Sequence, residues 1–242
     1  MQCKYYAMVT IDMEELKYHY KYPRPCVTTD CVVFGFDGAK LNVLLIERGI
    51  EPYKGCWAFP GGFLNMDETA LQGAKRELYE ETGLKNAYIH QFHAFSEVNR
   101  DPRDRVITIA YYALVRISEV KAGDDAAKAE WFPLNKVPSL AFDHDKVLRV
   151  ATQELRRQIH FEPIGFELLP EKFTMTQLQR LYEAILNVKF DRRNFCNKML
   201  KIGILTQLDE TLPMSNKKEA FLYKFNPESY NEMKERGFRL EF

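Results

Sequence analysis

Short apolar runs predict the strands of a sheet in the first part of the chain. Each run is rich in β-branched and aromatic residues, which favour extended backbone. The predicted strands are 27–36, 41–46, 57–59, 87–95 and 106–116. Asp37-Gly38 lies between the first two strands and is typical of a hairpin turn. Pro60-Gly61-Gly62 is predicted to be a loop.

Two segments have apolar residues at helical spacing. In 68–82 the apolar stripe is formed by Leu71, Ala74 and Leu78, with Asp67 as the expected N-cap and Gly83 as the expected stop. Residues 143–159 predict a connecting helix with one apolar face. Strands on both sides of a helix predict a mixed sheet flanked by helices over residues 25–140, which is the α/β class.

A different pattern follows the helix breakers in residues 161–165. Residues 178–186 predict a helix, and a second helix is expected at 192–202, between Asp191 as N-cap and Gly203. Two short strands, 204–208 and 221–225, are joined by a polar loop. We therefore divide the chain into a polar N-terminal segment (1–24), a domain with its connecting helix (25–160) and a C-terminal domain (161–242).

Composition narrows the possible classes of protein. Hydrophobic residues are 46% of the 242 residues, so a largely disordered chain is excluded. The 34 basic and 34 acidic side chains cancel, which excludes a uniformly basic nucleic-acid coat. No apolar stretch approaches the ~20 residues of a membrane span, and the polar start lacks the core of a signal peptide. We expect a cytoplasmic protein whose five scattered cysteines are reduced thiols.

Three carboxylates lie on one edge of the helix predicted at 68–82. Glu80 lies three residues after Glu77 and Glu81 lies four residues after it, and like charges at this spacing repel each other. A hard divalent cation bound by oxygen ligands would compensate the repulsion, and such a site suits metal-assisted attack of water on a pyrophosphate. Arg76 can hold a carboxylate with both ends of its guanidinium. Gly62 allows the preceding segment to approach a metal or substrate closely.

Residues 62–84 match the Nudix box, G-x5-E-x7-R-E-U-x-E-E-x-G-U, at all of its specified positions. The chain therefore resembles the Nudix hydrolase superfamily. This resemblance implies an α/β/α sandwich around a mixed sheet, and hydrolysis of a nucleoside diphosphate derivative with Mg²⁺ or Mn²⁺. It also implies that Glu77, Glu80 and Glu81 are metal ligands, that Arg76 and Glu68 support them, and that Gly62 shapes the loop.

A second resemblance covers nearly all of the chain after Tyr22. The segments 57–63, 100–103, 141–144 and 168–174 are similar to those of the Nudix-related transcriptional regulators. In that family a Nudix domain carries a C-terminal winged helix-turn-helix domain, and ADP-ribose is a known ligand. Many members have degraded boxes and no longer hydrolyse, whereas this chain retains every box residue.

Several other residues are candidates for the ligand site. Arg100, Arg103 and Arg105 share one charged turn, where they would clamp a pyrophosphate or form a solvated turn offset by neighbouring aspartates. His144 is a candidate helix cap, pocket residue or general base. Trp57 and Phe59 would stack on a base, but a core position is favoured. His90 and His93 are expected on opposite faces of a strand, which disfavours a zinc site.

The C-terminal domain is basic within a neutral protein. Residues 172–203 hold seven basic and two acidic side chains, a balance of 7 − 2 = +5. A helix-turn-helix places its second helix in the major groove of DNA, with basic residues on the phosphates. The candidate DNA-binding residues are Arg192, Arg193, Lys198, Lys201 and Lys217. The alternative is a dimerisation appendage with a solvated basic face.

Two functions remain open. The first is a metal-dependent pyrophosphohydrolase of ADP-ribose or a related nucleoside diphosphate derivative, fused to a DNA-binding domain. The second is a transcriptional regulator whose Nudix domain binds the ligand without turnover. Both predict operator DNA as a partner and a homodimer, because helix-turn-helix proteins commonly bind two half-sites.

Overall fold

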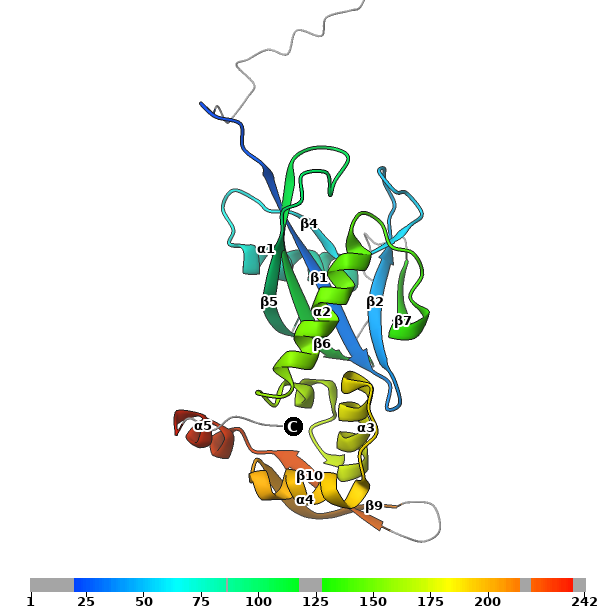
Figure 1. Cartoon of the computed structure of the whole chain (residues 1–242), viewed down its shortest axis with the longest axis vertical. Coiled ribbons are helices and arrows are strands. Elements are labelled where there is room, and N and C mark those ends of the chain that lie inside the picture. The colour runs from blue at the N-terminus through cyan, green and yellow to red at the C-terminus, as the bar shows by residue number, and fades with distance from the viewer. Residues whose placement is uncertain (1–19, 86, 118–127, 214–218, 237–242) are drawn as a thin grey trace, which may run out of the picture.

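The computed structural model describes residues 20–85, 87–117, 128–213 and 219–236. In this part of the chain, a mixed sheet with helices on both faces lies above a smaller unit of helices and short strands (Figure 1). Most of the predicted N-terminal segment lies outside the described residues.

Seven strands of the described chain form the larger sheet. They are β1 (Cys26–Phe36), β2 (Leu41–Glu47), β3 (Trp57–Ala58), β4 (Gly61–Phe63), β5 (Tyr88–Phe95), β6 (Val106–Arg116) and β7 (Ala129–Pro133). The spatial order is β3-β2-β1-β6-β5, while β4 pairs with β1 and β7 pairs with β2. β1 and β6 run parallel in register from Cys26–Val106 to Phe36–Arg116, and the other pairs are antiparallel. The predicted mixed sheet is confirmed.

Two helices cover the two faces of this sheet. Because side chains alternate along a strand, Cys31 and Val33 of β1 pack toward α1 (Ala70–Thr82). Val32 and Phe34 point to the opposite face, which α2 (His144–Gln158) covers. This arrangement confirms the predicted α/β/α sandwich.

The smaller unit begins with a 3-10 turn (Ile164–Leu168). It continues with β8 (Phe173–Thr174), α3 (Met175–Leu186), α4 (Arg192–Ile202), β9 (Leu205–Pro213), β10 (Glu219–Phe225) and α5 (Pro227–Glu235). Its sheet has the order β8-β10-β9. Two helices followed by a β-hairpin confirm the predicted winged helix-turn-helix. α4 begins after Asp191, whose side chain accepts from the Asn194 amide, and ends at Gly203 with φ 81°, as predicted.

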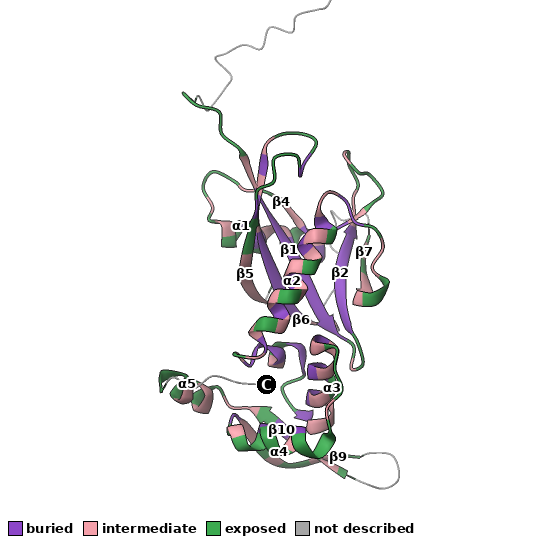
Figure 2. Cartoon of the chain, viewed as in Figure 1, coloured by how far each residue is buried: buried purple, intermediate pink, exposed green. Residues whose placement is uncertain are grey.

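One continuous apolar core joins the two units. It includes Phe34 of β1, Leu155 of α2, and Leu181 of α3, all of them fully buried. Figure 2 shows this buried material running from the large sheet down into α3. α2 therefore packs against both parts of the molecule.

Three local predictions are wrong. Gly61 and Gly62 belong to the short strand β4, which pairs with Thr29 and Asp30 of β1, not to a loop. The N-cap of α1 is Thr69 and not Asp67, because Thr69 and Gln72 form a reciprocal capping box.

His90 and His93 lie on the same face of the sheet, not on opposite faces. A bulge between Gln91 and His93 pairs these histidines with Tyr112 and Ala110, which both face α2. The described chain has no group of three metal-ligating side chains at this position or elsewhere.

Candidate active site and nucleic-acid interface

Arg76 organises the carboxylates of α1. Its guanidinium donates to Glu68 (Nη2 to Oε1, 2.7 Å), Glu77 (Nη1 to Oε1, 2.7 Å) and Glu80 (Nη1 to Oε2, 3.1 Å). A further bond reaches the Phe63 carbonyl at 3.2 Å. Hydrogen bonding to Arg76 lowers the pKa of Glu68 to about 2. Arg76 therefore ties the box helix to strand β4 and separates three negative charges.

Glu81 points away from this cluster, toward the sheet. Its Oε2 accepts a hydrogen bond of 2.8 Å from the Gly61 amide. Burial raises the pKa of Glu81 to about 8, with Glu77 and Asp30 adding to the shift, and burial also raises the pKa of Glu77. Carboxyl groups are thus concentrated in a site with restricted access to water, where burial favours their neutral forms.

Gly62 lies directly against the carboxylate of Glu77. A Cβ on Gly62 would lie 2.3 Å from Oε1 of Glu77, far inside contact distance. The close approach predicted for this glycine is therefore an approach to a box carboxylate.

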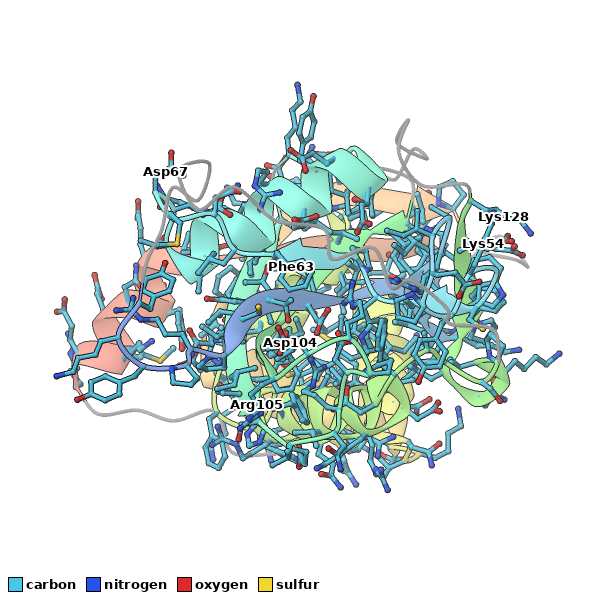
Figure 3. The ribbon with its side chains drawn as sticks, turned by 90° about the horizontal axis from the view of Figure 1, so that it is seen from above. Lys54, Phe63, Asp67, Asp104, Arg105 and Lys128 are labelled. Carbon is cyan, nitrogen blue, oxygen red and sulfur yellow. The ribbon has the colours of Figure 1, made fainter. Side chains whose placement is uncertain are left out.

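A cavity of about 310 Å³ lies next to this helix, at the end of the sheet opposite the winged unit. It brings together four of the predicted ligand residues with one box carboxylate: Gly62, Arg100, Arg103, His144 and Glu81. Arg105 does not line it, since its Nη1 donates to the Glu97 and Val106 carbonyls at 3.4 Å. Figure 3 looks onto this end and labels Phe63 of β4 together with Asp104 and Arg105 of the β5–β6 loop.

Arg100 is a buried structural cation. Its side chain is 4% exposed and donates two bonds to Asp143, Nε to Oδ2 at 3.1 Å and Nη2 to Oδ1 at 2.7 Å. Its Nη2 also lies 3.5 Å from Oδ2 of Asp30. The β5–β6 loop is therefore fixed to the start of α2 and to strand β1.

His144 is the first residue of α2 and is buried. Its Nδ1 accepts a hydrogen bond of 3.1 Å from the Phe59 amide, and its ring stacks on Phe59 with centroids 5.0 Å apart. Nε2 lies 3.7 Å from Oδ1 of Asp30. Burial lowers the pKa of His144, so the neutral ring with a proton on Nε2 is favoured. Both nitrogens are thereby directed at protein groups.

Arg103 and Arg48 flank an aromatic ring at the cavity wall. Arg103 binds Asp101 with two hydrogen bonds of 3.0 and 2.7 Å, and its Cζ lies 5.5 Å from the Phe142 ring centroid. Arg48 lies 4.8 Å from the same centroid, and its buried Nη2 has no hydrogen-bond partner among the described residues. Phe142 itself has φ 54°, a strained backbone conformation for a bulky residue.

Three residues of this site are not predicted from the sequence: Asp30, Arg48 and Phe142. Asp30 has a detectable signal, because a carboxylate interrupts the apolar run of β1. Arg48 and Phe142 lie in segments without periodicity, so their positions depend on the fold.

The two aromatic residues considered for base stacking are placed differently. Phe59 is 2% exposed and also lines the cavity, while Trp57 packs edge-on against Phe132, with ring centroids 4.8 Å apart.

The second candidate surface is the exposed face of α4. Four of the predicted DNA-binding side chains lie on it: Arg192, Arg193, Lys198 and Lys201. Phe195 and Met199 on the other side of α4 are buried in the core. Lys217 lies outside the described residues. Two other basic residues of this domain are paired with carboxylates, Lys172 with Glu210 and Lys189 with Glu183.

Two further observations concern the described part of the chain. None of its helices has the length and apolar character needed to cross a membrane. Cys26, Cys31, Cys56 and Cys196 are free, and burial raises the pKa of the Cys31 thiol. Cys3 lies outside the described residues.

Comparison with known proteins agrees with both halves of this description. Residues 24–152 match the NUDIX domain family, and residues 165–225 match the NrtR DNA-binding winged helix domain family. The chain is 32% identical to the "ADPR responsive transcriptional repressor NtrR" of Acinetobacter baylyi over 87% of this chain and 86% of the repressor. It is 42% identical to an "ADP-ribose pyrophosphatase" of Methanocaldococcus jannaschii over 60% of this chain and 84% of that enzyme.

A solved structure has the same architecture. The crystal structure of Shewanella oneidensis NrtR complexed with a 27mer DNA aligns with a TM-score of 0.75 and 27% identity, covering 88% of this chain and 97% of that chain. The two domains of this chain thus occur together in a known architecture. The chain belongs to the Nudix family, in the group whose members carry an NrtR-type DNA-binding winged helix domain.

Proposed function

We propose that this protein binds ADP-ribose or a related nucleoside diphosphate derivative, hydrolyses its pyrophosphate, and binds operator DNA through α4. The observation that carries the proposal is the cavity itself. Its lining includes Glu81 of the box helix together with Arg48 and Arg103, so a diphosphate held by the arginines would lie next to Glu81. The names of the relatives from Acinetobacter and Methanocaldococcus support ADP-ribose as the ligand.

The side chains fit a divalent metal by their chemistry. Glu77, Glu80 and Glu81 offer only oxygen ligands, as Mg²⁺ and Mn²⁺ prefer. Burial raises the pKa of Glu77 and of Glu81, with neighbouring carboxylates adding to both shifts, and a bound cation would favour the charged form of each side chain. When bound, the metal would supply charge neutralisation and activation of water for attack on the pyrophosphate. Arg76 forms ion pairs with Glu77 and Glu80. We therefore propose that binding of the metal requires these ion pairs to rearrange.

Other side chains of the chain bind and orient the substrate. The guanidinium of Arg48 has an unused nitrogen, and Arg103 can exchange one bond to Asp101 for a phosphate oxygen. Phe142 offers an aromatic face next to both cations. His144 is not favoured as the general base, because its Nδ1 already accepts from Phe59 and its Nε2 faces Asp30.

Replacing a box carboxylate tests the proposal. Glu80→Gln and Glu81→Gln should each abolish hydrolysis of ADP-ribose with Mg²⁺, because each change removes a charged metal ligand from a helix edge and not from the core. Product analysis with a panel of nucleotide sugars measures the loss, and circular dichroism checks the fold. Asp67→Asn is the matched control, since Asp67 is exposed beside the same helix and outside the specified box positions. Wild-type turnover in either glutamine variant contradicts the metal assignment.

A second candidate function is ligand sensing without turnover. It is favoured by one observation: within the described residues no three ligating side chains converge, because Arg76 occupies two of the carboxylates. This function predicts that the wild-type protein binds ADP-ribose in the presence of Mg²⁺ and releases no product. The same panel of nucleotide sugars therefore decides between the two functions.

DNA binding by α4 implies two further proposals. Helix-turn-helix proteins commonly bind two half-sites about one helical turn apart, so we propose that the protein acts as a homodimer. Because operator DNA is a partner, we also propose that the protein acts in the cytoplasm.

A further inference from the structure

A groove of about 740 Å³ lies where the large sheet meets the winged helix domain. Three parts of the fold line it: the β1–β2 hairpin, α2, and α3 with the turn that follows it. Figure 1 shows the tip of the β1–β2 hairpin next to α3. The groove and the ligand cavity share no residue.

Four cations line this groove. Lys189, in the turn after α3, is paired with Glu183, and the other three come from three elements: Lys40 of the hairpin, Arg156 of α2 and Arg180 of α3. Lys40 and Arg180 are exposed, and neither side chain has a hydrogen bond or ion pair within the described residues. Arg156 uses only its Nε, which donates to the Ile185 carbonyl at 2.9 Å. Its terminal nitrogens remain available for an anion.

The one carboxylate in the groove does not neutralise these cations. Glu183 accepts from Lys189 at 2.9 Å and from the Gln179 side chain and the Phe190 amide at 3.0 Å. Burial acts to raise the pKa of Glu183, but these hydrogen bonds outweigh burial and lower the pKa to about 2. Glu183 is therefore satisfied by Lys189 and by neighbouring amides, and Lys40, Arg156 and Arg180 form no ion pair with it or with another carboxylate of the described residues.

The rest of the lining is suited to a small organic ligand. Leu41, Leu134 and Val188 provide apolar surface, and Asn135 and Asn187 provide side-chain amides. Arginine and lysine side chains around an apolar floor suit a phosphorylated molecule with a flat or apolar body. A ligand that contacts Lys40, Arg156 and Arg180 at once would bridge the two domains.

We propose that this interdomain groove is a second ligand site, which binds a phosphorylated small molecule of the nucleotide class without a metal ion. Lys40, Arg156 and Arg180 hold its phosphates. Since those residues belong to the hairpin, the connecting helix and the winged helix domain, occupancy of the groove fixes the orientation of one domain against the other.

Calorimetric titration of the full-length protein with pyrophosphate and with ADP, in the presence of a metal chelator, tests this proposal. Without metal, the box carboxylates repel the anions, whereas the groove still attracts them. Lys40→Glu and Arg180→Glu should each weaken binding of both probes at least tenfold. Arg149→Glu is the matched control, because Arg149 is exposed on α2 and does not line the groove. All four proteins should unfold at similar temperatures, since the substituted side chains are exposed.

One further variant distinguishes binding in the groove from binding in the ligand cavity. Arg103→Ala removes a cation from the ligand cavity and should leave metal-free binding of pyrophosphate unchanged. Failure of the wild-type protein to bind either probe overturns the proposal, as does wild-type affinity in the two groove variants. So does loss of binding in Arg103→Ala alone. A fourth result, weaker binding of DNA by both groove variants with unchanged binding of pyrophosphate, would reassign the groove to DNA.

Discussion

Two arginines from one turn of the sequence have different roles because their surroundings differ. Arg100 is almost fully buried and binds Asp143 with two nitrogens, whereas Arg105 donates long bonds to backbone carbonyls at the surface. The charge of a buried ion pair depends on its partner for compensation, so removing one member leaves the other uncompensated. Arg100 therefore has a structural role in addition to lining the cavity.

Arg100→Ala should lower the free energy of unfolding by about 3–5 kcal/mol, because Asp143 and Asp30 lose their buried cation. Arg105→Ala should change it by less than about 0.5 kcal/mol, as is usual for surface substitutions. Urea titration followed by circular dichroism measures both values. Equal effects of the two substitutions would show that the ion pair with Asp143 does not stabilise the fold.

A substitution at Gly62 tests a second single-residue contact, the one with the carboxylate of Glu77. Gly62→Ala should reduce turnover of ADP-ribose at least tenfold, because the new Cβ would displace the Glu77 carboxylate from its position. The cost in stability should be about 1–3 kcal/mol, the usual range for overpacking. Steady-state kinetics together with thermal unfolding separate the two effects. Unchanged turnover would mean that the position of Glu77 is not critical for the reaction.

Among the helices, α4 combines one buried face with one basic face. Phe195 and Met199 fix it in the core, so its exposed cations are presented by a rigid element. Binding to DNA phosphates contributes affinity that falls with salt concentration, because each neutralised phosphate releases counterions.

The triple variant Arg192→Ala, Arg193→Ala, Lys198→Ala should therefore bind DNA more weakly across all sequences. The slope of log affinity against log salt should fall by about one unit for each phosphate that the variant no longer neutralises. Gel-shift titrations at several salt concentrations measure this, and turnover of ADP-ribose should stay unchanged. Arg149→Ala on α2 is the control for charge. Unaltered gel shifts in the triple variant would leave the winged helix domain as a dimerisation appendage.

The elements differ in how well the sequence predicts them. Helix α4 has clear capping residues at both ends, and strand β6 is a long, mostly apolar run. Their predicted bounds agree with the structure. Strand β4 has two glycines and only three residues, so nothing local distinguishes it from a loop; its pairing with β1 decides the outcome. The bulge in β5 is likewise invisible in the sequence, because it arises from the register with β6.

At the scale of the site, the box residues were predictable because they lie in one continuous motif. The remainder of the cavity is assembled from segments that are far apart in the chain. Arg48 follows β2 and Phe142 precedes α2, and only the fold brings them together. Their role is thus a property of the tertiary structure.

Across the whole molecule, α2 connects the ligand cavity to the winged helix domain. Its first turn is bound through Asp143 and His144, and Arg156 near its end donates to the Ile185 carbonyl of α3. Its 15 residues span about 22 Å, with Val147, Ala151 and Leu155 buried along the sheet. A rigid helix held at both ends transmits a displacement from one site to the other.

We therefore expect ADP-ribose to change the affinity for operator DNA, with a coupling of roughly 1–3 kcal/mol as in other allosteric proteins. Linkage requires that operator DNA changes the affinity for ADP-ribose by the same factor. Calorimetry of the Glu81→Gln variant, in which the ligand is not consumed, measures ADP-ribose binding with and without operator. DNA of unrelated sequence is the control. Equal ligand affinities in all titrations would mean that the domains are tethered but independent.

The apolar core that runs from Phe34 through Leu155 to Leu181 determines how a mutation in one domain affects the other. Because one apolar core includes residues of both domains, sheet and winged helix are expected to melt together as one cooperative unit. Loss of a core side chain in the winged helix would then lower the melting temperature of the ligand site as well. A mutation far from either functional surface could therefore produce both phenotypes at once, loss of ligand turnover and loss of gene control.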